Sequence, residues 1–240
     1  MLLEIAAFSL EAALAASASK AHRIELCSSF AAGGLTPAAG TLKAVASLVQ
    51  KDVFVMVRPR EGDFCYSNRE FESMIEEVRY IKSLGFKGIV SGILHPDGSI
   101  DKSRTRKLAE EAFPMSFTFH RAFDKSRNLP ESLETIIDCG CSRILTSGGE
   151  RSVDEGIPVI RQLIEQAAGR IIILPGGGVN SSNAMQLKEA GCTELHLSAR
   201  HWVEGSMIFK KEQPEFGSNI SIPDFLNLLP DPEIIDSLKV

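Results

Sequence analysis

The chain has 240 residues, of which 44% are hydrophobic, and it carries a formal net charge of −5. This size and composition suit one α/β barrel or two small globular domains. No basic run is present and the few aromatic residues do not alternate with lysine or arginine, which argues against a nucleic-acid partner. Glu4 and Glu11 interrupt the apolar N-terminal stretch, so that stretch predicts neither a signal peptide nor a membrane span.

The five cysteines predict a reducing compartment. Their number is odd, and the chain is long enough to bury a core without cross-links. We therefore expect free thiols and a cytoplasmic location. Cys139 and Cys141 form a CGC sequence that resembles a metal motif. It precedes a predicted strand, however, and so lies at the end of a barrel that usually serves stability rather than ligand binding.

Short apolar runs alternate with amphipathic stretches along the chain, a pattern that predicts parallel strands separated by helices. The predicted strands are 2–6, 22–26, 53–57, 88–94, 116–120, 143–146, 170–174 and 194–197. The predicted helices are 10–20, 37–50, 68–84, 101–113, 130–139, 154–168 and 181–190. Thr36 is expected to cap the second helix, because a proline follows it at the first helical position.

Eight such units predict a single TIM (β/α)8 barrel over residues 1–200 with a C-terminal extension. Residues 201–240 depart from the repeating pattern, and a short helix is expected at 232–238. We expect this tail to pack on the barrel or on a partner subunit. In barrels of this class the ligand site lies where the strands end and the βα loops begin.

The first two predicted strands each carry one carboxylate inside an apolar run. Glu4 and Glu25 both stand between two aliphatic residues. Because side chains alternate along a strand, both carboxylates face the barrel lumen if their apolar neighbours face the helices. A buried carboxylate needs a partner. Glu4 and Glu25 are therefore candidate catalytic acids or bases, or members of a structural ion pair with an arginine.

Cationic groups end the third and fifth predicted strands. Arg58 and Arg60 follow the third strand, and His120 and Arg121 follow the fifth, with Asp124 close behind. A guanidinium group suits a carboxylate or a phosphate, so these arginines are candidate anion-binding residues. We expect one arginine of the first pair to be structural and the other to meet the ligand. His120 is a candidate general acid or base, or a metal ligand.

Small residues follow the last two predicted strands. Gly176, Gly177 and Gly178 follow the seventh strand, and Ser198 follows the eighth. In many barrels the loops at these positions bind phosphate through backbone N–H groups, and glycine lets the backbone approach an anion closely. The glycine run is therefore a candidate anion site, or a tight turn without a ligand.

Nine motifs follow one another along the chain: LLEI at 2–5, HRIELC at 22–27, GGLTP at 33–37, VRPREGDFCYS at 57–67, DGSID at 97–101, TFHRAFD at 118–124, RILTSGG at 143–149, LPGGGV at 174–179 and ELHLSAR at 194–200. Together they closely resemble the CutC family. The resemblance implies a TIM barrel, a cytoplasmic homodimer and a role in copper homeostasis. It also implies a copper site of two cysteines, of which Cys27 matches the second, while Ala6 stands at the first position.

Two functions from different classes follow. The first, implied by the resemblance, is a copper-binding homeostasis protein with Cys27 as its metal ligand. The second is a barrel enzyme of lyase or isomerase type that acts on a small phosphorylated or carboxylated metabolite. There His120 would act as general acid or base with Glu4 or Glu25 as its counterpart, and the arginines would hold the anion. A purely structural scaffold would leave the charged strand ends unexplained.

Overall fold

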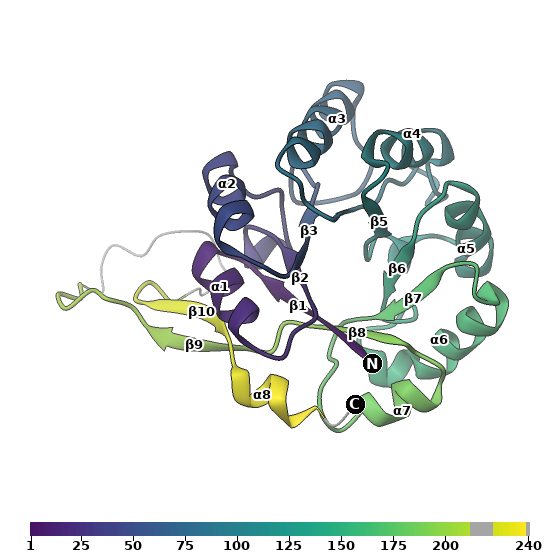
Figure 1. Ribbon diagram of the computed structural model, residues 1–240. Helices are drawn as coiled ribbons and strands as arrows, with labels where there is room; N and C mark the ends of the chain where they lie inside the picture. Colours follow the sequence, from purple (N-terminus) through teal and green to yellow (C-terminus); the bar gives the residue numbers. More distant parts are fainter. Residues whose placement is uncertain (212–222, 239–240) are drawn as a thin grey trace.

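The chain folds into a barrel of eight parallel strands surrounded by helices (Figure 1), which confirms the predicted TIM barrel. The computed structural model describes residues 1–211 and 223–238. The barrel strands are β1 (Leu2–Ala7), β2 (Arg23–Leu26), β3 (Asp52–Met56), β4 (Gly88–Ser91), β5 (Ser116–Phe119), β6 (Arg143–Thr146), β7 (Ile172–Pro175) and β8 (Glu194–Leu197). Neighbouring strands follow the order β7-β6-β5-β4-β3-β2-β1-β8, and β7 contacts β8 where the two ends of the sheet meet.

Helices connect the strands and cover the outside of the barrel (Figure 1). They are α1 (Leu10–Ala18), α2 (Ala39–Leu48), α3 (Asn68–Ser83), α4 (Lys102–Ala112), α5 (Leu129–Asp138), α6 (Val153–Ala167) and α7 (Ala184–Glu189), with short 3-10 turns η1 (Phe30–Ala32) and η2 (Phe123–Lys125). Ser67 and Glu70 form a capping box that fixes the start of α3. The predicted cap of α2 is wrong: the helix begins at Ala39, and the Thr36 hydroxyl instead donates to the Arg58 carbonyl.

Apolar side chains pack in two separate layers. The outer core lies between the strands and the helices and includes Val55 and Ile89. The inner core lies inside the barrel and consists of Cys27, Phe54, Met56 and Val90. Successive residues of a strand point to opposite faces, so Val55 joins the outer core while its neighbours on β3 join the inner core. The lumen is thus filled by few side chains, which leaves room for polar groups.

An ion-pair layer fills the amino end of the barrel. Arg23 donates to both Glu4 and Glu194, and Arg143 Nε lies 2.9 Å from Glu194 Oε2. The guanidinium carbons of Arg23 and Arg143 lie 4.7 and 5.1 Å from the centroid of the Phe54 ring. These charges therefore neutralise one another inside the barrel, where burial of an unpaired charge would cost several kcal/mol.

The C-terminal tail adds a hairpin and a short helix to the barrel. Strands β9 (Arg200–Glu204) and β10 (Leu226–Pro230) pair antiparallel, and α8 (Pro232–Ser237) confirms the predicted helix. Strand β10 contacts α1 and β1, and Ile235 and Leu238 are buried in the outer core. Residues 212–222 and 239–240 of the predicted extension lie outside the described residues. Of the helices in the described ranges, none has the length and apolar character needed to cross a bilayer.

Candidate functional site

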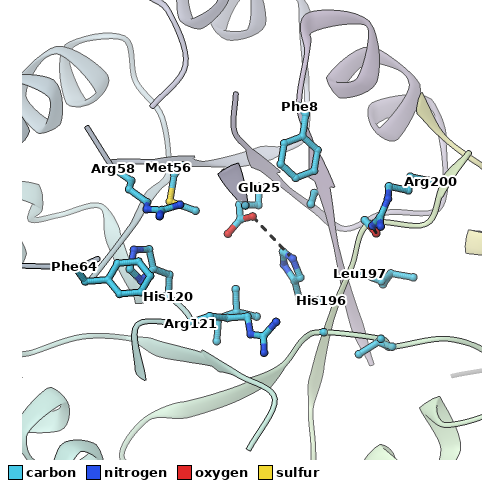
Figure 2. Close-up of a pocket in the computed structure, with 17 residues that line it drawn as sticks. Phe8, Glu25, Met56, Arg58, Phe64, His120, Arg121, His196, Leu197 and Arg200 are labelled. Carbon is cyan, nitrogen blue, oxygen red and sulfur yellow. Dashed lines mark hydrogen bonds and ion pairs between the residues drawn. The ribbon is translucent and has the colours of Figure 1, made fainter. Parts of the chain in front are cut away.

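A cavity of about 360 Å³ opens at the carboxyl end of the strands (Figure 2). Its wall includes two of the predicted glycines, Gly177 and Gly178, and the aromatic rings of Phe8 and Phe64. Its charged and polar side chains are Glu25, Arg58, His120, Arg121, His196, Ser198 and Arg200. The structure thus brings most of the predicted site residues to one place, whereas Glu4, Cys27, Arg60 and Gly176 lie outside the cavity wall.

His196 connects the two predicted acids at the floor of the cavity. Its Nδ1 lies 2.7 Å from Glu4 Oε1, and its Nε2 lies 3.9 Å from Glu25 Oε2. Glu4 is fully buried and also accepts a hydrogen bond from Arg23. Glu4 therefore lies beneath the cavity in an ion pair with Arg23, and Glu4, Glu25 and His196 also bring ligand atoms within 4.8 Å of one another. Glu25 lies in the cavity wall.

The three floor residues differ in protonation. Burial would raise the pKa of Glu4, but the hydrogen bond with His196 and the charge of Arg23 outweigh it and lower the pKa to about 2. Burial raises the pKa of Glu25, and the charge of Glu4 adds to this effect. Burial opposes a charge on His196, yet the charges of Glu25 and Glu4 raise its pKa. Glu4 is therefore firmly ionised, whereas Glu25 is the carboxylate whose charge is less well stabilised.

His196 and Arg23 are site residues that the sequence analysis missed. His196 stands between two leucines in β8, in the same alternating pattern that singled out Glu4. Because β8 closes the barrel beside β1, His196 pairs with Glu4 in the strand register, and Arg23 pairs with Glu4 from the other side. The predicted fold together with this alternation could have found both residues.

Cys27 and Met56 place two sulfur-containing side chains beside Glu25. The Sγ atom of Cys27 lies 3.4 Å from Glu25 Oε2. A Cβ added to Gly34 would lie 3.2 Å from Cys27 Sγ and 3.4 Å from the methyl carbon of Met56, so both side chains pack closely against Gly34. The other carboxylate oxygen, Glu25 Oε1, is buried and has no hydrogen-bond partner within the described ranges.

The two arginines after β3 have different positions. Arg58 borders the cavity, and its Nη1 and Nη2 donate to the carbonyl oxygens of Ala32 at 2.6 Å and Gly62 at 3.1 Å. Arg60 turns away from the cavity, and its Nε lies 2.7 Å from Glu70 Oε1. Arg60 is therefore the structural arginine of the pair, and its predicted place in the anion site is not borne out by the cavity wall. Arg58 meets the cavity but also joins two loops.

His120 lies in the cavity wall against Phe64, with 4.9 Å between the ring centroids. Its Nδ1 accepts a hydrogen bond from the Ala122 N–H at 3.2 Å, which leaves the proton on Nε2. Burial, together with the nearby charge of Arg58, lowers the pKa of His120 to about 3. Near neutral pH the ring is therefore uncharged, which favours a hydrogen-bond donor over the acid–base role expected from the sequence.

Arg121 is held at the rim by one residue of its own loop after β5 and one residue of the loop after β6. Its Nε lies 2.7 Å from Asp124 Oδ2, and its Nη2 lies 2.6 Å from Ser147 Oγ. The third nitrogen, Nη1, lies 3.0 Å from the point where a Cβ on Gly177 would stand. A side chain at Gly177 would therefore displace the guanidinium group, which explains why glycine fits this position.

The loops after β7 and β8 complete the rim. Gly177 and Gly178 line the cavity with φ angles of 107° and 90°, in the left-handed region that favours glycine. Gly176 serves packing instead, because a Cβ there would lie 2.5 Å from a leucine methyl carbon. Ser198 accepts a hydrogen bond from Arg200 Nη1 at 2.5 Å, and both residues border the cavity.

The fold and the cavity define a (β/α)8-barrel protein with a cavity at the carboxyl end of its strands, which is where barrels of this class bind their ligands. The family model described as "CutC family" matches residues 1–201. The chain belongs to the CutC family, which confirms the resemblance seen in its motifs.

Known proteins similar to this chain include CutC proteins from animals and bacteria. The copper homeostasis protein cutC homolog of Homo sapiens is 44% identical over 225 residues, which cover 93% of this chain and 82% of the human protein. A family protein CutC of Erwinia tasmaniensis is 41% identical, with coverages of 99% and 94%. The crystal structure of a CutC protein from Streptococcus agalactiae matches with a TM-score of 0.78 and 31% identity over 82% of this chain and 98% of that one.

More distant solved structures share the barrel alone. The aldolase QR15 matches with a TM-score of 0.61 over 81% of this chain and 89% of its own, at 14% identity. Identity this low carries no argument about activity, because one barrel fold hosts many unrelated reactions.

Proposed function

We propose that the chain acts in copper homeostasis by holding Cu(I) between Met56, which lines the cavity, and Cys27, which lies beside Met56 behind the cavity wall. The human and mouse relatives are named copper homeostasis proteins. The observation that carries the proposal is that the Cys27 and Met56 side chains pack together against Gly34, with the Cys27 thiol next to the Glu25 carboxylate. Soft thiolate and thioether ligands select Cu(I), so these residues fit the ion.

Met56 would supply the second sulfur ligand that β1 does not offer. Ala6 borders the cavity where the family resemblance implies a cysteine, and a methyl group cannot bind a metal. Leu26 pairs with Val55 in the register of β2 and β3, so Cys27 and Met56 are the next residues on neighbouring strands. A thiolate and a thioether would hold Cu(I) with less negative charge than two thiolates, which suits reversible binding.

The buried oxygen of Glu25 also supports a cation at this point. Glu25 Oε1 has no hydrogen-bond partner in the part of the chain that the structure describes. A buried polar atom without a partner costs about 1–3 kcal/mol, and a bound cation would remove that cost. Glu25 would thus stabilise the ion as a nearby charge or as a third ligand.

An anaerobic Cu(I) titration against a chromophoric competitor tests the proposal. We expect one equivalent to bind the wild-type protein. Cys27→Ser should weaken binding at least a hundredfold, since it removes the thiolate, and Met56→Leu should weaken it about tenfold, since it keeps the volume but removes the thioether.

Matched variants control for effects on the core. Cys141→Ser changes a buried cysteine at the far end of the barrel, and Met74→Leu changes a fully buried methionine of α3. Both should bind Cu(I) like the wild type. Equal affinity of the Cys27→Ser variant and the wild type would rule out this copper site.

We also propose that the protein is a cytoplasmic homodimer. All five cysteines are free thiols, which suits a reducing compartment. Ile208 is 99% exposed, and the neighbouring Met207 and Phe209 are also exposed. A second copy of the chain would cover this apolar patch. Light scattering at micromolar concentration should give twice the monomer mass for the wild type and a lower mass for Ile208→Asp.

A further inference from the structure

The outer half of the cavity wall is cationic. Arg58, Arg121 and Arg200 reach it from three separate segments, the loops after β3 and β5 and the start of β9. Glu25 is the one acidic side chain among the described wall residues, and it lies on the floor beside His196 (Figure 2). Asp124 pairs with Arg121 from outside the cavity wall, and a bound anion would reduce the remaining repulsion among these like charges.

Several hydrogen-bond donors on this wall have no partner. His120 Nε2 and Arg58 Nε are buried and unpaired within the described ranges. The backbone N–H groups of Gly177 and Gly178 donate to no other group in those ranges, although both residues border the cavity. Buried donors in native proteins are nearly always satisfied, so His120 Nε2 and Arg58 Nε point to a ligand rich in acceptor oxygens. The N–H groups of the half-buried Gly177 and the exposed Gly178 are free to donate to the same ligand.

We propose that the outer half of the cavity binds the phosphate group of a small phosphate ester, with Arg121, the Gly177–Gly178 backbone and Ser198 as its receptors. A phosphate presents oxygens in several directions, and the donors come from the loops after β5, β7 and β8. A planar carboxylate would meet only the donors that share one plane. Phosphate is also the anion that barrels commonly bind at the loops after their seventh and eighth strands.

The cavity has room for more than the phosphate group itself. Its volume of about 360 Å³ lies within the usual range for small-molecule sites. Phe8, Phe64 and Leu197 provide apolar wall next to the cationic groups. An organic group on the phosphate would contact these side chains, while the neutral His120 ring would donate to one of its oxygens. This site uses a different part of the wall from Cys27 and Met56 and does not depend on the proposed function.

Isothermal titration of the metal-free protein tests the inference with three probes: glycerol 3-phosphate, inorganic phosphate and glycerol. We expect glycerol 3-phosphate to bind, inorganic phosphate to bind more weakly because it makes no apolar contacts, and glycerol not to bind. Malonate distinguishes a phosphate site from a general anion site and should bind more weakly than either phosphate. No heat of binding from glycerol 3-phosphate at millimolar concentration would overturn the proposal.

Two variants and one control assign the site. Arg121→Gln should weaken binding of glycerol 3-phosphate at least tenfold, and Ser198→Ala should weaken it severalfold. Arg127→Gln is the matched control, because Arg127 lies on the same rim with similar exposure but pairs with Asp97 outside the cavity wall. Equal affinities of the Arg121 and Arg127 variants would refute the assignment, and Ser198→Ala decides the matter if Arg121→Gln does not fold. Cu(I) titration of the same variants should be unchanged, which separates this site from the copper site.

Discussion

At the residue scale, Glu4 and Glu25 show how neighbouring charges determine whether a buried carboxylate is stabilised in its ionised form. Both are buried on adjacent strands, and Glu25 pairs in register with Ala6, two residues beyond Glu4. Glu4 has two cationic partners, Arg23 and His196, whereas the nearest cation to Glu25 is His196 at 3.9 Å. The charge of the first carboxylate is therefore the better stabilised of the two, and we expect the second to be the more available to a ligand.

The variant Glu4→Gln should be strongly destabilised. It leaves Arg23 and His196 in a buried site without their shared counter-charge, and breaking a buried ion pair in this way costs about 3–5 kcal/mol. Urea denaturation at pH 7 measures the loss. Glu134→Gln, which removes a solvent-exposed partner of Arg170, is the control and should change the stability little.

The difference in unfolding free energy between the wild type and Glu4→Gln should also depend on pH. The pKa of Glu4 is about 2 in the folded protein and 4.5 when the group is free. A lowered folded pKa contributes stability that is fully present above the free value and is lost as the pH falls through the folded value. The difference in unfolding free energy between wild type and Glu4→Gln should thus be largest at about pH 5 to 6 and shrink toward pH 2 as Glu4 is protonated. It should also shrink above pH 6.5, because His196, whose pKa is raised partly by the charge of Glu4, then loses its proton. A difference that stays constant down to pH 2 would contradict the assigned ion pair.

At the element scale, the positions of the strands could be predicted from sequence more fully than the contacts of the loops at the carboxyl end of the barrel. The eight strands can be predicted because short apolar runs alternate with amphipathic stretches along the chain, and each strand must bury one face against helices. The hairpin of β9 and β10 could not be predicted, because its pairing joins segments separated by residues without any strand pattern. The roles of Arg58 and Arg60 also could not be assigned from sequence. The two arginines are separated only by Pro59, and they differ only in the loops that they contact in the folded chain.

Strand packing inside the barrel predicts opposite effects for two glycine substitutions. A Cβ on Gly88 in β4 would lie 2.6 Å from the Phe54 ring, whereas a Cβ on Gly40 in α2 would meet no atom within 4 Å. Gly88→Ala should therefore lower the unfolding free energy by about 1–3 kcal/mol through overpacking. Gly40→Ala should raise it by about 0.5–1 kcal/mol, since alanine favours the helix. Equal effects in chemical denaturation would mean that Phe54 has space to move.

At the scale of the whole molecule, the tail and the barrel share one core. Ile235 in α8 is 1% exposed and packs with residues of the outer core, while its neighbour Ile234 is 37% exposed. The tail therefore contributes to the stability of the barrel, and the two should unfold together.

Two neighbouring substitutions test this coupling. Ile235→Ala should lower the unfolding free energy by about 2–5 kcal/mol, because it leaves a cavity in the shared core. Ile234→Ala should change it by less than about 1 kcal/mol. Denaturation followed by the fluorescence of Trp202 in β9 and by circular dichroism should give coincident transitions. Separate transitions would show that the tail is an independent unit.

The ion-pair layer closes the amino end of the barrel beneath the cavity. The amino end of the barrel is filled by Arg23, Arg143 and Phe54. Cu(I) at Cys27 and a phosphate ester beside Arg121 would therefore both enter and leave through the carboxyl end. Because the site at Cys27 is the deeper one, the phosphate ester beside Arg121 would have to dissociate before Cu(I) could leave. If both proposed ligands bind, a phosphate ester at the rim would therefore slow the release of Cu(I) from the deeper site.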